Sequence, residues 1–517
     1  MERLLPAPDK PAVEPEDVLR AVSALEAVAG DPELMAALPK EHLVRLMRAA
    51  GRLARPTPLD RARMRKALRR RRRRQQCLDD RQARDGAGIR EARQTPVYSA
   101  PPRRKDSPDA ARHLKKPRFC YVCKTAYTKL HFFYDSMCES CGDFNYDKRF
   151  QNADLSGQTA LITGARLKIG YQAALMMLRA GARVIATTRF PQDAALRYSG
   201  EKDYGAWKER LSVHGLDLRH SPSVEIFARF LDRGEPRLDI LINNAAQTVR
   251  RPPAFYGHLL KTEALSAAEL PRRAAELLAA HEDCKAALAC SPSLDRLPPP
   301  DTTGLAAWHG GAPGVGIRES ARLSQLRYAY DDGQSGRDAF PNGRVDADLQ
   351  QVDLRLVNSW RLQLAEVSTP EMLEVQLVNA VAPFILCGKL KALMLRGDTG
   401  AGHVVNVSAM EGSFSRHTKT DKHPHTNMAK AALNMMTLTS APDYARGGVH
   451  MNAVDTGWVT DEDPAQHSAR KRDQLDFAPP LDIVDGAARV CDPFFSGLLS
   501  GRHLWGKFFK DYKPTAW

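Results

Sequence analysis

A chain of 517 residues is too long for one ordinary hydrophobic core, so two or three domains are expected. The net charge of +15 is concentrated at the start: residues 1–118 have 29 Lys and Arg against 16 Asp and Glu, whereas the remainder has 47 against 45. No apolar run reaches the roughly 18–20 residues of a membrane span, and the N-terminus is charged where a signal peptide is apolar. We therefore expect a cytoplasmic protein with no membrane contact.

The first 116 residues predict a helical segment, 1–55, followed by a basic and flexible linker, 56–116. Apolar residues of the first segment recur at helical spacing. The second segment is poor in apolar residues and contains six consecutive arginines, 69–74. It is either a contact for nucleic acid or an acidic partner, or a solvated helix or linker. No aromatic residues interleave with the arginines to stack on bases, which favours the second interpretation.

Residues 117–150 contain two Cys-x-x-Cys pairs separated by fourteen residues. The pairs are Cys120 with Cys123 and Cys138 with Cys141. Four thiolates fill the tetrahedral positions of a zinc ion and leave none for an activated water, so they predict a structural site in a zinc-ribbon-like module. A redox dithiol is the alternative. The other cysteines are scattered, which suits a reducing compartment better than a disulfide framework.

Residues 159–189 predict a strand, a glycine turn, a helix and a second strand. This βαβ unit implies a doubly wound, Rossmann-type parallel sheet, and we assign it to a domain at 151–517. In such a unit the glycine turn brings a dinucleotide pyrophosphate to the N-terminus of the helix, where free N–H groups and the helix dipole favour an anion.

Seven motifs follow one another along 154–247 and 360–510. They are TGARLKIG at 163–170, Asp217-Leu218, NNAA at 243–246, VNAVAPF at 378–384, HVVNVS at 403–408, NMAKAAL at 427–433 and MNAVDTGWV at 451–459. One such motif is weak evidence, but seven in this order resemble the short-chain dehydrogenase/reductase superfamily. The resemblance implies NAD(P)-dependent hydride transfer between nicotinamide and a carbonyl or alcohol of an unidentified small molecule.

The resemblance also implies the residues of the site. Cofactor contacts are expected from Gly164, Arg166, Lys168, Ile169, Gly170, Arg189, Asp217, Leu218, Asn244, Ala245, Lys430, Gly457 and Val459. Catalytic roles are expected for Asn379, Ser408 and Lys430. Lys168 stands where the family has a glycine. Arg189 follows the second strand, where NAD users often have an acid, so it favours the 2′-phosphate of NADP over NAD; the alternative is a surface arginine.

The family's catalytic tyrosine, four residues before the lysine, corresponds to Thr426. An aliphatic hydroxyl is far less acidic than a phenol, so Thr426 is a poor proton donor. The loop before it is rich in histidine, and His425 is the candidate replacement because imidazole titrates near neutral pH. The alternative is a polar loop without a role in proton transfer. The chain would then be a non-catalytic NAD(P)-binding scaffold or regulatory protein that acts through its zinc module and basic N-terminal region.

An insertion at about 250–357 separates two parts of this family pattern. Asn244 and Asn379 lie 135 positions apart, where the family needs a few tens. Because the insertion leaves the carboxyl end of a parallel strand, it either caps the substrate pocket or forms a partner surface. Its glycine run, 310–316, follows no strand and is not expected to bind a nucleotide. By analogy with the family, we expect a homo-oligomer.

Overall fold

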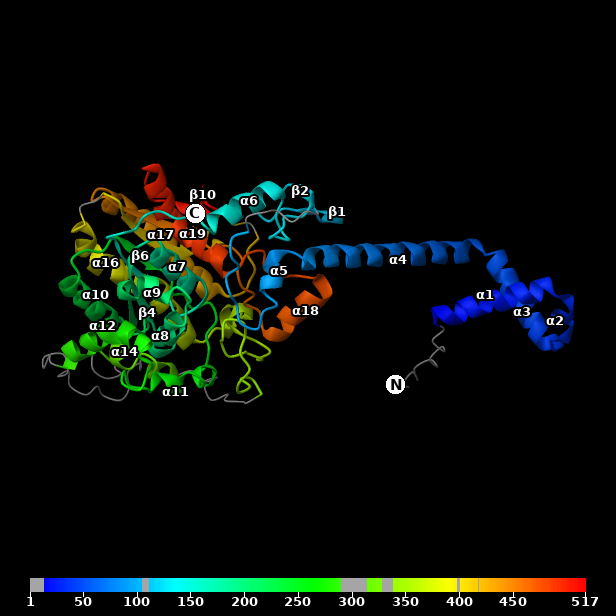
Figure 1. The fold of residues 1–517 in the computed structure, drawn as a ribbon, viewed down its shortest axis with the longest axis horizontal. Coiled ribbons are helices and arrows are strands. Elements are labelled where there is room, and N and C mark those ends of the chain that lie inside the picture. Colours follow the sequence, from blue (N-terminus) through cyan, green and yellow to red (C-terminus); the bar gives the residue numbers. More distant parts are fainter. Residues whose placement is uncertain (1–13, 105–110, 290–313, 328–337, 398–399, 417) are drawn as a thin grey trace. The chain divides into compact units, whose positions relative to one another are not determined.

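A computed structural model describes residues 14–104, 111–289, 314–327, 338–397, 400–416 and 418–517 (Figure 1). Most of the predicted glycine run, 310–313, lies outside these residues. The chain divides into two compact units, Met1–Leu78 and Asp79–Trp517.

The first unit is helical, as its apolar spacing predicts. It contains α1 (Pro15–Gly30), α2 (Pro32–Ala37) and α3 (Lys40–Ala54), and α4 begins in it (Pro58–Asp85). The segment predicted as a flexible linker is therefore largely helix, because α4 and α5 (Gly88–Ala92) span much of it. Arginine, leucine, lysine and glutamine are good helix formers, which explains the difference. The arginines 69–74 are exposed, in keeping with the solvated-helix interpretation; the nucleic-acid contact stays a prediction.

The cysteine-rich module forms a hairpin and a helix. Strand β1 (His113–Phe119) pairs antiparallel with β2 (Ala126–Lys129), and α6 (Glu139–Lys148) follows. Its aromatic side chains form a small core together with Ile89 of α5 and apolar residues near the start of α19 (Ile483–Ser500). The module is therefore packed on the larger domain.

The second unit is built on an eight-stranded sheet in the order β10-β9-β8-β7-β6-β3-β4-β5. Its strands are β3 (Thr159–Thr163), β4 (Arg183–Thr188), β5 (Leu211–Gly215), β6 (Ile240–Asn243), β7 (Gly402–Ser408), β8 (Val449–Asp455), β9 (Phe508–Lys510) and β10 (Lys513–Thr515). All neighbouring strands are parallel except β9 and β10. This confirms the predicted Rossmann-type sheet.

Helices cover both faces of the sheet. α7 (Lys168–Arg179) and α19 pack on one face, and α10 (Ser221–Gly234), α16 (Ala382–Leu395) and α17 (Pro424–Ala445) pack on the other. The other helices are α8 (Pro191–Ser199), α9 (Tyr204–Trp207), α15 (Thr369–Gln376) and α18 (Ala465–Leu475), with a π-helical turn, η7 (Leu377–Val381), between α15 and α16. The 3-10 turns are η1 (Lys208–Arg210), η2 (Pro253–Tyr256), η3 (Arg322–Gln325), η5 (Ser359–Arg361), η6 (Leu364–Glu366) and η8 (Met410–Gly412).

The described part of the insertion contains α11 (Leu260–Glu263), α12 (Arg272–Ala289) and α14 (Val315–Arg318). α12 packs on α8 and on the edge strand β5, and its Leu277 and Leu278 join the core. The insertion thus extends the helical layer that covers the sheet.

Among the described residues, one helical stretch, Thr369–Leu395, is long and apolar enough to cross a membrane. The sequence has no uninterrupted apolar run of that length here, because Glu374 and Lys389 bound the apolar residues between them. In its most apolar window 56% is buried, and α16 packs on α10, β6 and β7, as expected of a core helix. Cytoplasmic location stays a prediction.

Candidate active site

A cleft of about 1120 Å³ lies at the carboxyl ends of the parallel strands. Its wall includes Gly164 after β3, Arg189 after β4, Asn244 after β6, Ser408 of β7 and Asp455 of β8. Open α/β sheets bind their ligands at this edge. All predicted cofactor contacts line the cleft: Gly164, Arg166, Lys168, Ile169, Gly170, Arg189, Asp217, Leu218, Asn244, Ala245, Lys430, Gly457 and Val459.

The turn between β3 and α7 and the first turn of α7 each need a glycine. Gly164 has φ 69°, and a Cβ there would lie 2.9 Å from the Cα of Ala245. A Cβ on Gly170 would lie 2.4 Å from both Nδ2 of Asn244 and the carbonyl oxygen of Gly164. Asn244 holds the turn, since its Nδ2 donates to the carbonyl of Thr163 (2.9 Å). The predicted motifs at 163–170 and 243–246 are therefore in direct contact and fix each other's conformation.

Lys168 keeps the backbone shape of the glycine that it replaces. Its φ is 55°, in the left-handed region that favours glycine. For an L-residue this conformation costs roughly 1–2 kcal/mol. Lys168 begins α7 and lines the cleft, so the departure from the family pattern adds a cation at the helix N-terminus.

Two predicted arginines differ in what they contact. Arg166 is buried and its Nη1 pairs with a carboxylate oxygen of Asp193 at 2.7 Å, so its charge is already compensated. Arg189 donates from Nη2 to the hydroxyl of Tyr256 (2.8 Å), and its guanidinium carbon lies 4.8 Å from the centre of that ring. Within the described part of the chain, no salt bridge pairs Arg189 with a carboxylate, although its charge contributes to lowering the pKa of Asp217.

The wall of the cleft is basic overall. The described residues that line it include twelve Lys and Arg but only six Asp and Glu. One of the acids, Asp217, is fully buried; burial opposes its ionisation, but contact with Arg219 (2.6 Å) holds the pKa of Asp217 below its ordinary value. Its negative charge is thus compensated within the protein, and the cleft suits a phosphate-bearing ligand.

Lys430 and Ser408 are the predicted catalytic residues that reach the cleft. The ammonium of Lys430 donates to the carbonyl of Val407 (2.7 Å), and burial lowers the pKa of Lys430 to about 8. Ser408 Oγ donates to Oδ1 of Asn434 at 2.5 Å. Lys430 is therefore the group in this pair that can exchange a proton near neutral pH.

Three other predicted catalytic residues, Thr426, His425 and Asn379, do not line the cleft. Thr426 is 1% exposed, and its hydroxyl has no hydrogen-bond partner among the described residues. His425 is equally buried, and its Nε2 lies 3.4 Å from Oε1 of Glu371. A threonine hydroxyl ends one bond beyond Cβ, whereas a tyrosine hydroxyl lies a full ring farther out. The side chain of Thr426 is therefore too short to reach where a tyrosine hydroxyl would lie.

Asn379 does not line the cleft but hydrogen-bonds a residue that does. It lies in η7, its Oδ1 accepts from the backbone N–H of Gln247 (2.7 Å), and its Nδ2 donates to the carbonyl of the same residue (3.1 Å). Gln247 itself lines the cleft. Asn379 thus positions the segment after β6. π-helical turns are frequent at functional sites.

The cysteine-rich module supplies part of the wall, which the sequence did not indicate. Tyr121 and Lys124, next to the first two cysteines, both line the cleft. The hydroxyl of Tyr121 accepts from the backbone N–H of Trp458 (3.1 Å), and a Cβ on Gly457 would lie 3.1 Å from that oxygen. No local motif relates residues more than 300 positions apart, so only the packed structure places them together.

The histidine-rich loop also reaches the cleft, but through His423 rather than His425. The imidazole of His423 stacks on Trp360, with ring centres 4.0 Å apart and planes at 6°. Burial lowers the pKa of His423 below 6.5. The composition of the loop predicts polar residues, but the stack of His423 on Trp360 depends on packing between distant segments.

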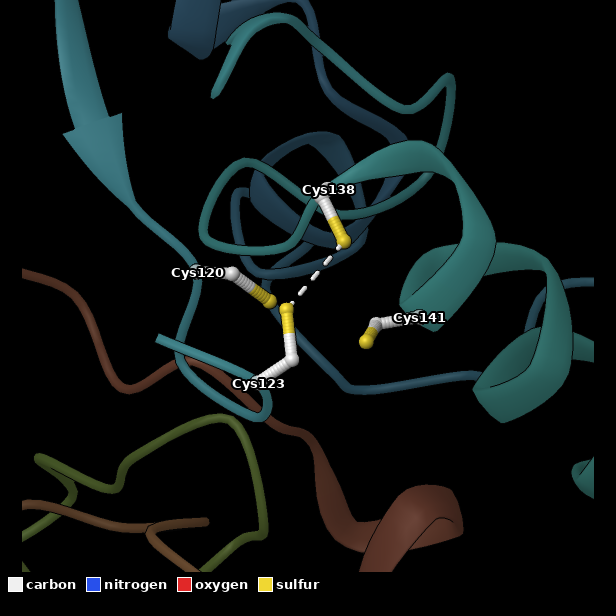
Figure 2. A group of neighbouring side chains, drawn as sticks. All are labelled: Cys120, Cys123, Cys138 and Cys141. Carbon is white, nitrogen blue, oxygen red and sulfur yellow. Dashed lines mark hydrogen bonds between the residues drawn. The ribbon is translucent and has the colours of Figure 1, made fainter. Parts of the chain in front are cut away.

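The four cysteines converge at one point (Figure 2). Their Sγ atoms lie within 4.8 Å of one another, Sγ of Cys123 lies 3.6 Å from Sγ of Cys138, and none of the four is in a disulfide. Zinc–sulfur bonds of 2.3 Å put tetrahedral sulfurs ~3.8 Å apart, so the spacing suits zinc. The first pair lies on the turn between β1 and β2, and the second at the start of α6.

Buried charges fix the module on the domain. Nη1 of Arg149 lies 2.6 Å from Asp482 and 2.9 Å from Asp485, and all three side chains are almost completely buried. Tyr134 also donates its hydroxyl to Asp485 (2.5 Å). Because these carboxylates open α19, the cysteine module is held to a core helix.

Two family models match the parts of the chain that build the cleft. The short chain dehydrogenase model matches residues 158–259, and the Enoyl-(Acyl carrier protein) reductase model matches residues 356–479. The matches lie on either side of the insertion.

Relatives include a viral protein of similar length and several animal dehydrogenases. Uncharacterized protein R665 of Acanthamoeba polyphaga mimivirus is 33% identical over 396 residues, which is 73% of this chain and 71% of that protein. Retinol dehydrogenase 14 of Mus musculus is 42% identical over 100 residues, 18% of this chain and 30% of that one. The chain matches at most about a third of the length of such animal dehydrogenases.

One solved structure, NADPH-bound carbonyl reductase from chicken fatty liver, is 15% identical to this chain, with a TM-score of 0.41. The alignment covers 72% of this chain and 98% of the reductase chain. The two matched segments contain the strands β3 to β8, whose carboxyl ends form the cleft. Residues 158–259 and 356–479 of the chain therefore match the short-chain dehydrogenase/reductase superfamily.

Proposed function

We propose that this protein is an NADP-dependent oxidoreductase that transfers hydride between the nicotinamide and a carbonyl or alcohol group of a small molecule. The observation that carries the proposal is Lys430. It is a buried amine that lines the same cleft as the glycine turn and the other predicted cofactor contacts, and burial lowers its pKa to about 8. A group that can exchange a proton thus lines the cleft in which we propose that the cofactor and its substrate bind.

The preference for NADP over NAD rests on Arg189. It follows β4, where the adenosine ribose is held in Rossmann-type folds, and a cation there suits a 2′-phosphate. Tyr256 holds the guanidinium in place by a hydrogen bond and ring contact. Lys168, at the start of α7, adds a second charge near the expected pyrophosphate.

The bound cofactor would supply or accept the hydride, and the protein would manage the proton. We assign the proton donor for carbonyl reduction to Lys430, because neither Thr426 nor His425 lines the cleft. The carbonyl of Val407 orients its ammonium. We assign positioning roles to Ser408 and Asn379. The hydroxyl of Ser408 donates a hydrogen bond to Asn434, and Asn379 accepts one from the backbone N–H of Gln247.

We further propose that the four cysteines hold a structural Zn²⁺. The support is the approach of all four Sγ atoms and the filled ligand set, which leaves no position for an activated water. Zinc would fix the turn that carries Tyr121 and Lys124 into the cleft wall.

A non-catalytic scaffold that binds NADP is the second candidate. It is favoured by the burial of Thr426, since the family's proton donor has no counterpart in the cleft. Such a protein would act through the zinc module or through the exposed arginines 69–74, which could contact nucleic acid or an acidic partner.

NADPH binding and turnover separate the two candidates. We would measure NADPH binding by titration calorimetry and NADPH oxidation with a panel of aldehydes and ketones, for the full chain and for Lys430→Met. The expected result is at least one substrate whose turnover is lost in Lys430→Met but kept in Lys391→Met, a control on the surface. NADPH binding without turnover of any carbonyl above that of Lys430→Met would favour the scaffold, and absence of NADPH binding would refute both.

A further inference from the structure

Three histidines meet at the edge of the sheet opposite the cleft. His403 and His450 are the second residues of β7 and β8, and they are paired in the register of these parallel strands. Paired residues of neighbouring strands project from the same face. His503 joins them from the turn between α19 and β9.

The imidazole nitrogens are close enough to share an ion. Nε2 of His403 lies 2.9 Å from Nδ1 of His503, and one ring nitrogen from each histidine lies within 4.8 Å of the others. Zinc–nitrogen bonds of 2.0–2.1 Å put tetrahedral ligands ~3.3 Å apart. Small side-chain movements would therefore bring all three nitrogens to bonding distance.

A backbone carbonyl orients one of the three rings. Nδ1 of His450 lies 3.2 Å from the carbonyl oxygen of Gly402. Because a carbonyl only accepts, Nδ1 must carry the proton, and Nε2 keeps its lone pair for a metal. Metal-binding histidines commonly donate their second nitrogen to a carbonyl or carboxylate in this way.

A glycine in α19 makes room for the cluster. A Cβ on Gly497 would lie 2.6 Å from Nδ1 of His503 and 3.4 Å from Nε2 of His403. Glycine within a helix costs roughly 0.5–1 kcal/mol relative to alanine. The space that the imidazoles occupy is therefore created by a residue on a third element.

We propose that His403, His450 and His503 bind a divalent transition-metal ion of the Zn²⁺ type, with a fourth position open to water. Neutral imidazole is a preferred ligand of zinc, copper and nickel. Ser408 lies five positions after His403 along β7, so the site lies about 17 Å from the cleft. Its role is structural: the ion ties the turn after α19 to β7 and β8. The proposal does not depend on the oxidoreductase assignment.

Metal content of the full chain tests the proposal. The chain would be stripped with a chelator under reducing conditions, reloaded with Zn²⁺, dialysed and analysed by mass spectrometry. We expect two zinc ions per chain, one at the cysteines and one at the histidines. His450→Gln and His503→Gln should each lose one equivalent, whereas His42→Gln, an exposed histidine of α3, should lose none.

Cobalt substitution distinguishes loss of the site from loss of the fold. The histidine variants should lose ligand-field absorption of the second Co²⁺ but keep the thiolate-to-cobalt charge-transfer bands of the cysteine site. The same metal content and visible spectrum in all four proteins would overturn the proposal. Loss of zinc together with the charge-transfer bands in both histidine variants would also count against it, because the histidines would then act on folding.

Discussion

Replacing Arg149 by methionine tests how the cysteine module is held. The guanidinium faces two carboxylates, Asp482 and Asp485, and the exposed fractions of the three side chains are 1%, 3% and 0%. Removing one partner of a buried ion pair typically costs about 3–5 kcal/mol, because the remaining charge is neither solvated nor compensated. Arg149→Met leaves two such charges, so we expect a loss near the upper end of that range.

The variant should also respond to pH in a defined direction. In the native protein burial opposes ionisation of Asp482, but Arg149 holds the pKa of Asp482 below its ordinary value, so its contribution to stability is present above about pH 4. Without the cation, both carboxylates are stabilised by protonation instead. The deficit of Arg149→Met should therefore be largest near neutral pH and shrink as the pH falls toward 4.

Urea unfolding followed by circular dichroism measures this deficit, and titration calorimetry measures NADPH binding by the same samples. Arg103→Met is the matched control: Arg103 pairs with Asp147 at 2.9 Å, but both side chains are more than half exposed. Such a pair contributes about 0–1 kcal/mol. If Arg149→Met costs no more than Arg103→Met at pH 7, or if its deficit grows on acidification, the reasoning about buried charge is refuted.

Three further predictions concern the cleft. Arg189→Met should weaken NADPH binding about 10–100-fold, the value of one charge-assisted hydrogen bond, and should leave NADH binding nearly unchanged in calorimetry; equal losses for both cofactors would contradict a 2′-phosphate contact. Because Lys430 must be protonated to donate and burial lowers its pKa to about 8, kcat/KM for carbonyl reduction should fall as the pH rises through 8. A rate that is flat from pH 6 to 10 would exclude Lys430 as the donor. Gly170→Ala should abolish NADPH binding and lower the melting temperature, because its Cβ would lie 2.4 Å from the carbonyl oxygen of Gly164, whereas Gly205→Ala, in open space, should change neither.

The cofactor turn is the part of the site that sequence predicts well. Gly164 and Gly170 are required by backbone geometry and by the approach of Asn244, and such local requirements leave a readable pattern. Strand order follows from the same logic, because parallel strands with helical connections have few allowed topologies. For this reason each predicted cofactor contact lies in the cleft.

The proposed proton donor is harder to predict from sequence, because the choice depends on reach and burial. The family's sequence pattern predicts that Thr426 and His425 lie next to the cofactor, but it cannot show that both side chains are buried. Nor can it show that burial lowers the pKa of Lys430. Likewise, the hydrogen bond between Tyr121 and Trp458 joins segments that are related only by docking of the module. The composition of 56–116 also favours a linker because it is highly charged, but the helix propensity of its arginines favours α4.

The turn between Cys120 and Cys123 has a thermodynamic consequence under the proposed assignments. It would be fixed by zinc on one side and would form a wall of the cofactor cleft, through Tyr121, on the other. Two ligands that order the same segment share a coupling free energy, and this coupling is reciprocal. Zinc would therefore tighten NADP binding by the same factor by which NADP tightens zinc binding. The affinity for a redox cofactor would then vary with the supply of a metal that takes no part in the chemistry.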